Sequence, residues 1–275
     1  MSEVMKKMLV LDFDGTLFQP GKFISDQDLK LLKALANMSV VRVIATGRSL
    51  FSLKKVIDMS FPIDYLILST GVGILDWRSQ KLIRSYDMEG GLVDEIIAIL
   101  KRRRHSFFVH QPAPQNHNFF YCDGAAPRQD FIRRFELYRD FARPLKQRKR
   151  GTAASQILVI SEELQQIKEE LQPLMHRINI IRTTSPLDGR SMWVEIFDKR
   201  VNKALAAQFL AERLNISVRN IVALGNDYND LDLLNWAGSA FVVHTAPEEL
   251  KEKFQIIKNA DDGLLIHIMP LLQRG

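Results

Sequence analysis

The stretch Met8-Leu9-Val10-Leu11-Asp12-Phe13-Asp14-Gly15-Thr16 decides the fold. Four apolar residues run into an aspartate, which is typical of a buried parallel strand that ends at a carboxylate. Two other apolar runs end in the same way: Val40–Ala45 precedes Thr46-Gly47-Arg48, and Ile221–Leu224 precedes the segment Gly225–Asp230. Open parallel sheets bind ligands beyond the carboxyl ends of their strands. We therefore expect these polar residues to meet at one edge of a sheet.

Strands and helices alternate on both sides of this pattern. Ser25 or Asp26 can cap a helix, and the apolar run Tyr65–Leu68 predicts another strand. The rhythm returns near the end, where Lys203–Leu214 and Leu231–Leu234 are predicted helices and Ala240–Val243 is a predicted strand. Such alternation favours right-handed crossovers and a parallel sheet. The sequence therefore predicts an α/β, Rossmann-like core.

The middle of the chain follows a different pattern. Stretches of period two, such as Phe107–His110, Ile157–Ile160 and Ile178–Thr183, are mixed with predicted helices at Leu92–Arg103 and Glu162–Met175. This mixture is typical of an α+β domain rather than of a doubly wound sheet. We predict a core made of residues 1–73 and 191–275, and an inserted α+β domain at residues 74–190.

The composition of the chain is typical of a globular protein that does not span a membrane. The 275 residues are 46% hydrophobic and 25% charged, as in soluble globular proteins, and Cys122 is the single cysteine. The apolar runs are too short to cross a bilayer, and residues 1–7 contain no apolar signal segment. We therefore expect a cytoplasmic protein that does not interact with membranes.

The excess of positive over negative charge is confined to the middle of the chain. Residues 74–190 contain 20 Lys and Arg against 14 Asp and Glu, whereas the remainder is balanced at 18 of each. Two runs dominate the excess, at residues 101–104 and 146–150. They are typical either of solvated helix ends or of a field that attracts anionic ligands. Because the runs lack interleaved aromatic residues, we do not expect a nucleic-acid partner.

The predicted sheet edge concentrates oxygen atoms. Four aspartates, two asparagines and Thr46 follow the three strands, and Lys203 opens a predicted helix. Carboxylates packed together are costly unless a cation offsets their charge. Oxygen ligands suit a hard ion, and Mg²⁺ is the usual one where phosphate also binds. The sequence therefore predicts a magnesium site.

The motifs at this edge resemble those of the haloacid dehalogenase superfamily. Asp12–Leu17 is similar to its first motif, and Ala45–Arg48 is similar to the second motif of its Cof-like and sucrose-phosphatase-like branch. Val194–Ile196 followed by Val201–Leu205 resembles the third motif, with Lys203 as its lysine. Leu224–Asp230 resembles the fourth motif. Asp261-Asp262-Gly263 resembles the closing segment of the branch. The insert falls where this branch carries a large α/β cap, which sets substrate specificity.

The resemblance implies a role for each residue. Asp12 would be the nucleophile that forms an aspartyl-phosphate, and Asp14 the general acid and base. Thr46 would donate a hydrogen bond to the phosphoryl oxygens, and Lys203 would offset charge in the transition state. Gly47, Arg48 and Arg190 complete the candidate substrate-binding residues, although Arg48 can equally brace the loop after its strand. The implied metal ligands are Asp12, Asp14, Asn226, Asp227 and Asp230.

The fourth motif departs from the family pattern. Asn226 stands where an aspartate normally ligates the metal. An amide oxygen can still bind Mg²⁺ but contributes no charge, and Asp227 could supply the carboxylate instead. The sequence leaves open which of the two residues ligates the ion.

Three classes of function remain open. The first is a magnesium-dependent phosphatase acting on a small phosphorylated metabolite, with a sugar phosphate as the expected substrate. The second is a phosphotransferase or mutase on the same fold. The third is a catalytically weak regulatory protein that binds phosphate, which the asparagine at position 226 makes plausible. The sequence does not indicate an oligomeric state.

Overall fold

The computed structural model describes residues 6–19, 24–124, 129–185, 187–257 and 263–273. The chain forms two compact units. The first unit contains residues 1–47, 57–84 and 202–275, and the second contains residues 48–56 and 85–201. The predicted boundaries at 74 and 190 fall earlier than this division. Residues 73–76 and 81–85 form strands of the first sheet, whereas residues 192–198 form a strand of the second. Asp261 and Asp262 of the predicted closing segment lie outside the described residues.

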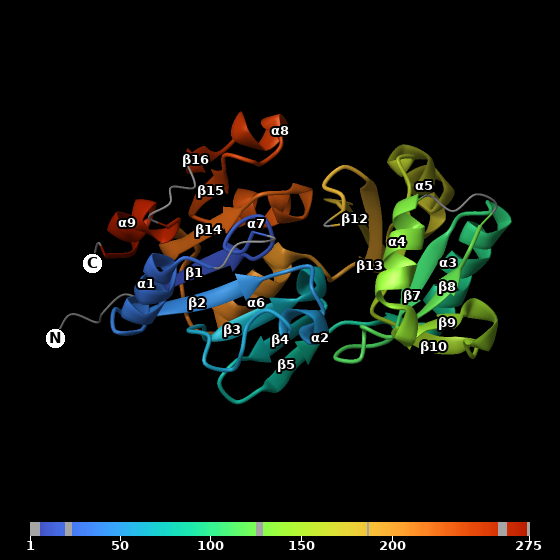
Figure 1. The fold of residues 1–275 in the computed structure, drawn as a ribbon, viewed down its shortest axis with the longest axis horizontal. Coiled ribbons are helices and arrows are strands. Elements are labelled where there is room, and N and C mark those ends of the chain that lie inside the picture. Colours follow the sequence, from blue (N-terminus) through green and yellow to red (C-terminus); the bar gives the residue numbers. More distant parts are fainter. Residues whose placement is uncertain (1–5, 20–23, 125–128, 186, 258–262, 274–275) are drawn as a thin grey trace. The chain divides into compact units, whose positions relative to one another are not determined.

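The first unit is built on an eight-stranded sheet of order β16-β15-β14-β1-β2-β3-β4-β5 (Figure 1). The pairings from β16 to β3 are parallel, and β4 pairs antiparallel with β3. Its strands are β1 (Lys7–Asp12), β2 (Val40–Ala45), β3 (Tyr65–Leu68), β4 (Gly73–Asp76), β5 (Lys81–Ser85), β14 (Ile221–Gly225), β15 (Ser239–Val243) and β16 (Gln255–Ile257). The predicted α/β fold, with a parallel core sheet and a separate inserted sheet, is confirmed.

Helices cover both faces of this sheet. Met8, Val10 and Val43 share a core with the alanines and Leu210 of one helix. On the opposite face, Arg42 Nη1 donates to the carbonyl of Leu32 in another helix at 3.0 Å, because residues 42 and 43 point to opposite sides of their strand. The helices of the first unit are α1 (Asp26–Ala36), α6 (Lys203–Arg213), α7 (Leu231–Trp236), α8 (Glu248–Lys251) and α9 (Met269–Gln273). Among the described residues, no helix is long and apolar enough to cross a membrane.

The second unit is built on a six-stranded sheet of order β12-β13-β11-β7-β8-β9, antiparallel except for the pair β8 and β9. Its strands are β7 (Phe107–His110), β8 (Phe119–Cys122), β9 (Ala142–Pro144), β11 (Gln156–Ile160), β12 (Ile178–Thr184) and β13 (Met192–Asp198); β6 (Met88–Glu89) pairs with β10 (Gly151–Ala154). Its helices are α2 (Leu50–Leu53), α3 (Gly90–Arg102), α4 (Gln129–Leu137) and α5 (Leu164–Glu170).

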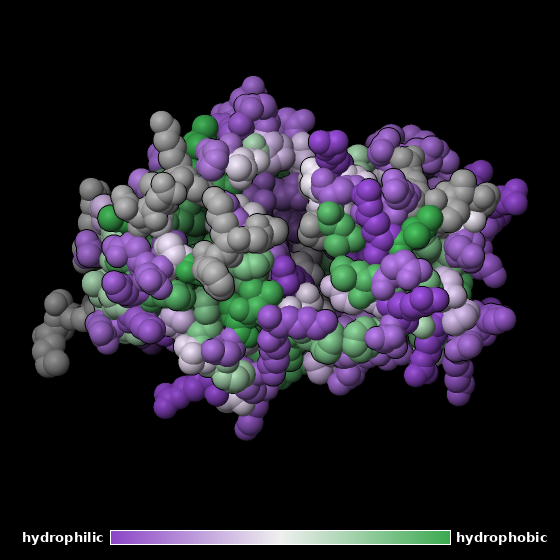
Figure 2. All heavy atoms as spheres, in the orientation of Figure 1, coloured by the Kyte–Doolittle hydropathy of each residue, from purple (hydrophilic) through white to green (hydrophobic). Residues whose placement is uncertain are grey.

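The two faces of the second sheet differ in chemistry. One face packs against apolar residues of α3 and α5. The other packs Phe108 and Trp193 against α4 and also buries polar groups. Gln156 Nε2 donates to Glu195 Oε1 at 2.6 Å, and Thr183 Oγ1 donates to Glu195 Oε2 at 3.0 Å. Outside these cores, hydrophilic residues cover most of this unit in the view of Figure 2.

His110 is buried in the second unit as a neutral ring. Its Nδ1 lies 2.7 Å from the carbonyl oxygen of Asn116 and therefore carries the hydrogen, since a carbonyl only accepts. Nε2 is left as the acceptor, with Arg134 Nη2 at 3.4 Å. Burial, assisted by the positive charge of Arg134, lowers the pKa of His110 to about 3. The folded protein therefore resists protonation of this ring.

We expect this histidine to make the protein sensitive to acid. The unfolded chain takes up the proton near pH 6.5, whereas the folded chain does so near pH 3. The contribution of His110 to the free energy of unfolding is therefore fully present above pH 6.5. It is lost as the pH falls towards 3, by up to about 1.4 kcal/mol per pH unit. Urea denaturation between pH 4 and 7 measures this slope. The slope of the free energy of unfolding against pH should shrink in His110→Gln and persist in His176→Gln, which replaces an exposed histidine. Equal slopes in both variants would show that His110 does not cause the pH dependence.

Candidate active site

Asp12 ends the central strand of the first sheet. β1 pairs with β14 on one side and with β2 on the other, so the chain order reverses at this strand. The register places Leu11 beside Leu224 and Asp12 beside Ala45, which brings the loops after β14 and β2 next to the aspartate. Ligands of open α/β sheets bind at such a switch point. Asp12 is only 4% exposed there.

Lys203 joins two carboxylates inside this edge. It is the first residue of α6, and Asn202 caps that helix by accepting from the amide of Leu205. The Lys203 ammonium is fully buried and donates at 2.6 Å both to Asp12 Oδ1 and to Asp230 Oδ1. A third contact, at 3.3 Å, reaches Asn229 Oδ1. One lysine thus fixes the orientation of Asp12 from across the sheet.

The charges at this edge are not balanced within the protein. Burial and the neighbouring Asp230 raise the pKa of Asp12 to about 8, although Lys203 opposes this rise. Burial alone would lower the pKa of Lys203, but the attraction of both carboxylates outweighs burial and raises it. Lys203 is therefore charged, and a second cation would be needed to offset both carboxylates when Asp12 is ionised.

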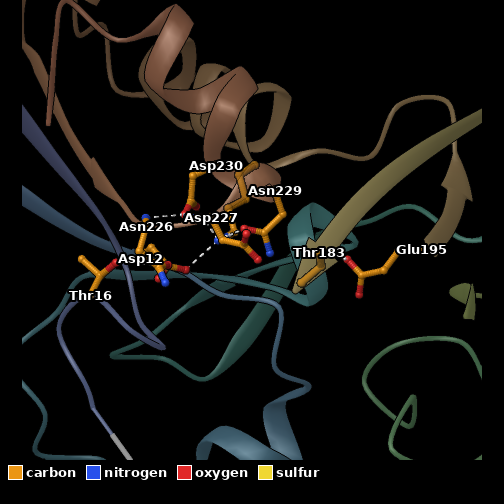
Figure 3. A network of polar contacts seen from close by, with 9 residues as sticks. Asp12, Thr16, Thr183, Glu195, Asn226, Asp227, Asn229 and Asp230 are labelled. Carbon is orange, nitrogen blue, oxygen red and sulfur yellow. Dashed lines mark hydrogen bonds and ion pairs between the residues drawn. The ribbon is translucent and has the colours of Figure 1, made fainter. Parts of the chain in front are cut away.

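The loop after β14 turns its acidic side chains in different directions (Figure 3). Asp230 Oδ2 accepts from the backbone amides of Asn226 at 2.9 Å and Asp227 at 3.2 Å, so this carboxylate ties the loop to Lys203. The Asp227 side chain accepts from the backbone at Asp230 and completes a capping box. The Asn226 side chain faces the end of β1. The structure therefore brings Asn226 to Asp12 and engages Asp227 and Asp230 within the loop.

The oxygen atoms nearest Asp12 suit a hard cation. Asp12 Oδ2 and the backbone carbonyl of Asp14 both face the terminal amide of Asn226. With its oxygen turned inward, this amide completes a set of one carboxylate, one carbonyl and one amide oxygen, a donor set that fits Mg²⁺. Within the described part of the chain, no three His, Cys, Asp or Glu side chains stand close enough to hold an ion. A Mg²⁺ site at this edge therefore depends on the carbonyl and amide oxygens as well as on the carboxylate.

Thr46 and Gly47 lie at the end of β2. Thr46 is fully buried, and its backbone amide donates to the carbonyl of Ile67 at 2.9 Å. A Cβ on Gly47 would lie 3.9 Å from Asn229 Nδ2, which places this glycine beside the loop after β14. The structure thus brings Asp12, Thr46, Gly47, Lys203 and the loop 226–230 to one edge, as the sequence predicts.

Sequence reasoning missed the end of β3. Ser69 and Thr70 are buried with positive φ angles of 48° and 59°, a costly conformation for residues with side chains. The amide of Thr70 donates to the carbonyl of Thr46 at 2.9 Å, which holds this turn against the second motif. Polar residues directly after the apolar strand Tyr65–Leu68 were the available signal.

Arg48 and Arg190 belong to the second unit. Arg48 Nη1 lies 3.4 Å from both the carbonyl and the hydroxyl oxygen of Ser52, which fits the bracing role that the sequence allows. Arg190 is exposed, and its backbone amide donates to Asp188 Oδ1 at 2.9 Å. Their roles in substrate binding stay predictions.

Gly15 permits the close approach of Asn226. Its φ of 79° is strained for other residues, and a Cβ there would lie 2.3 Å from Asn226 Nδ2. We expect Gly15→Ala to lose about 1–3 kcal/mol of stability from backbone strain alone, and more from the clash. Gly189→Ala is the matched control, because Gly189 has a φ of 66° and open space around its Cβ position. Denaturant titration of both variants tests this; equal losses would show that the contact with Asn226 contributes nothing.

Comparisons with known proteins show the family of this chain. A family model described as haloacid dehalogenase-like hydrolase matches residues 9–268. Two phosphatases of Bacillus subtilis that act on 5-amino-6-(5-phospho-D-ribitylamino)uracil, YwtE and YcsE, are each 23% identical to this chain. The first match covers 93% of this chain and 94% of the relative, and the second covers 94% and 92%. The match extends over nearly the whole of each relative.

Solved structures share the fold. A phosphatase of the HAD superfamily, BT1666 from Bacteroides thetaiotaomicron, is 19% identical with a TM-score of 0.78, over 98% of this chain and 96% of that one. The sugar phosphatase BT4131 of HAD subclass IIB is 18% identical with a TM-score of 0.74, over 96% of this chain and 98% of that one. The predicted superfamily and enzyme class are confirmed by the family match. This chain belongs to the haloacid dehalogenase-like hydrolases.

Proposed function

We propose that this protein is a magnesium-dependent phosphatase that hydrolyses a small phosphomonoester through an aspartyl-phosphate at Asp12. The observation that carries the proposal is the Asp12 carboxylate, which is fixed at the end of the central strand by Lys203 at 2.6 Å. Its second oxygen is turned towards the loop after β14. A carboxylate with so little freedom is suited to in-line attack.

The proposed reaction has two steps. Asp12 attacks the phosphorus atom and the ester P–O bond breaks, while Asp14 gives a proton to the leaving alcohol oxygen. Asp14 then takes a proton from a water molecule, which attacks the same phosphorus and releases inorganic phosphate and free Asp12. Lys203 and Thr46 stabilise the phosphoryl oxygens, through charge and through a hydroxyl donor.

Mg²⁺ would be held by Asp12, the Asp14 carbonyl and Asn226, and when bound it neutralises charge on the phosphoryl group. Its charge beside Asp12 would also lower the raised pKa of that carboxyl, so that the nucleophile is ionised at neutral pH. Asp230 supports this set indirectly, since its oxygens already accept from Lys203 and from two backbone amides. Asp227 remains the alternative carboxylate ligand that the sequence raises.

The proposed substrate is a sugar phosphate or a similar polyol phosphate. The names of the relatives support this class, because BT4131 is a sugar phosphatase and YwtE acts on a ribitylamino phosphate. The second unit is proposed as the cap that sets substrate specificity, with Arg48 and Arg190 as candidate contacts. Its net positive segment is suited to attracting an anionic metabolite.

A screen of phosphorylated metabolites with Mg²⁺ tests the proposal. Sugar phosphates, polyol phosphates and nucleotides would each be incubated with the purified full chain, and inorganic phosphate would be measured with and without EDTA. We expect release that requires Mg²⁺ and equals the substrate consumed. Phosphate transferred to an added alcohol with little release would indicate a phosphotransferase. No turnover of any phosphomonoester would contradict the proposal.

A further inference from the structure

The side-chain amide of Asn226 lies against two acceptors at the end of β1. When its nitrogen points inward, Nδ2 donates to the backbone carbonyl of Asp14 at 3.1 Å and to Asp12 Oδ2 at 3.0 Å. When its oxygen points inward, that oxygen faces the same two acceptors and accepts from the Thr16 hydroxyl at 3.4 Å. The two orientations occupy the same space and differ only in which atom meets Asp12 and Asp14.

The nitrogen-inward orientation suits the metal-free protein. This orientation places a donor against both acceptors at once, whereas the oxygen-inward orientation packs three acceptor oxygens together. A proton on Asp12 could satisfy the oxygen-inward orientation only in part, because it leaves the Asp14 carbonyl facing another acceptor. The oxygen-inward orientation is suited to a cation, which attracts all three oxygens together.

The rest of residue 226 is held while its amide turns. Its backbone amide donates to Asp230 Oδ2 at 2.9 Å, and Asp230 is itself fixed by Lys203 at 2.6 Å. The missing side chain of Gly15 leaves room for the amide, since a Cβ there would touch Asn226 Nδ2. A turn of the terminal amide therefore exchanges its two atoms without moving the loop.

We propose that Asn226 closes its own metal site when the ion is absent: its Nδ2 hydrogens take the place of the cation between Asp12 and Asp14, and binding of Mg²⁺ turns the amide so that Oδ1 faces the ion. The inference rests on the magnesium site of the proposed function. Two hydrogen bonds must break for each ion bound, so the metal-free protein is stabilised and the affinity for Mg²⁺ is reduced. An aspartate at this position would have the opposite effect on both quantities.

Three variants of the full chain test this closure. Asn226→Asp replaces the donor with a carboxylate, and Asn226→Ala removes the amide. Asn229→Asp is the matched control, because it adds the same charge in the same loop beside Lys203, whose Nζ lies 3.3 Å from Asn229 Oδ1. Scanning calorimetry in EDTA and in MgCl₂ gives the melting temperatures, and isothermal titration with MgCl₂ gives the dissociation constant.

We expect Asn226→Asp to have opposite effects on stability without and with Mg²⁺. In EDTA, Asn226→Asp and Asn226→Ala should melt several degrees below the wild type, whereas Asn229→Asp should not. In MgCl₂, Asn226→Asp should gain more stability than the wild type, and its dissociation constant for Mg²⁺ should fall about fivefold or more. Asn226→Ala should bind Mg²⁺ more weakly than the wild type.

Two outcomes would overturn the inference. Either Asn226 variant could melt with the wild type in EDTA, which would show that the amide donates nothing there. Alternatively, Asn226→Asp could bind Mg²⁺ no more tightly, which would show that residue 226 does not face the ion. These readouts do not use turnover. If the variants show the expected melting temperatures and affinities but the protein hydrolyses no phosphomonoester, the phosphatase proposal is contradicted and the closure stands. If the protein hydrolyses a phosphomonoester but the variants behave like the wild type, the closure is contradicted and the phosphatase proposal stands.

Discussion

Asp12→Asn is expected to abolish phosphate release while leaving the protein folded. An amide cannot attack phosphorus, so turnover should fall by at least about a thousandfold. The side chain keeps its shape, and its oxygen can still accept from Lys203, which lies 2.6 Å from Asp12 Oδ1. Because burial and Asp230 already disfavour the ionised form of Asp12, removing its charge should not lower the melting temperature. Phosphate release under saturating Mg²⁺, together with calorimetry, measures both effects.

Asp28→Asn is the matched control for this experiment. Asp28 is another buried aspartate of the first unit, and its Oδ1 accepts from the backbone amides of Leu264 at 2.9 Å and Leu265 at 2.8 Å. Its replacement should lower the melting temperature and leave the rate of phosphate release unchanged. Asp12→Asn should thus lose turnover and keep its stability, whereas Asp28→Asn should lose stability and keep its turnover. Near-normal turnover in Asp12→Asn would show that Asp12 is not the nucleophile.

Among the variants described here, Lys203→Met is expected to lower the free energy of unfolding most. Its ammonium is fully buried between Asp12 and Asp230, so its removal leaves two carboxylates without their cation. Breaking a buried ion pair in this way costs about 3–5 kcal/mol. Urea denaturation in EDTA measures the loss. Lys7→Met is a suitable comparison, because Lys7 is also buried and donates to the neutral carbonyl of Leu271 at 2.8 Å.

A double variant tests the physical cause of this loss. If the cost of Lys203→Met comes from uncompensated charge, then removing one charge with Asp12→Asn should restore part of the stability. The coupling expected for groups in direct contact is about 0.5–3 kcal/mol. Additive losses in the double variant would mean that Lys203 stabilises the fold through packing of its stem instead.

Much of the core follows from local pattern. Val40–Ala45 and Tyr65–Leu68 are strands with the predicted bounds, and the predicted helix at Lys203–Leu214 ends one residue earlier in the structure. These segments are apolar runs that end in polar residues, so burial on both faces of a parallel sheet leaves few alternatives. The arrangement of the site follows from the same rule, since parallel strands deliver the residues after their ends to one edge.

The assignment of strands to sheets does not follow from local pattern. The sequence placed the return to the core at residue 191, whereas β13 pairs with β11 and β12 of the second unit. Its alternation suits either sheet, and only distant partners decide between them. The directions of Asn226 and Asp227 also depend on backbone amides of their loop, which a motif does not specify. The helix predicted at Glu162–Met175 is shorter in the structure, where α5 spans Leu164–Glu170.

The position of β1 in its sheet also bears on synthesis at the ribosome. Met8 pairs with Val41, which is made shortly afterwards, and with Ile221, which is made much later. Asp12, the proposed nucleophile, therefore emerges long before Lys203 and Asp230, whereas most of the second unit is one continuous run of the chain. Long-range pairing of this kind is slow to form. Asp12 thus lies within this Lys203–Asp230 network only after residue 230 has been made, and shorter nascent chains carry Asp12 without it.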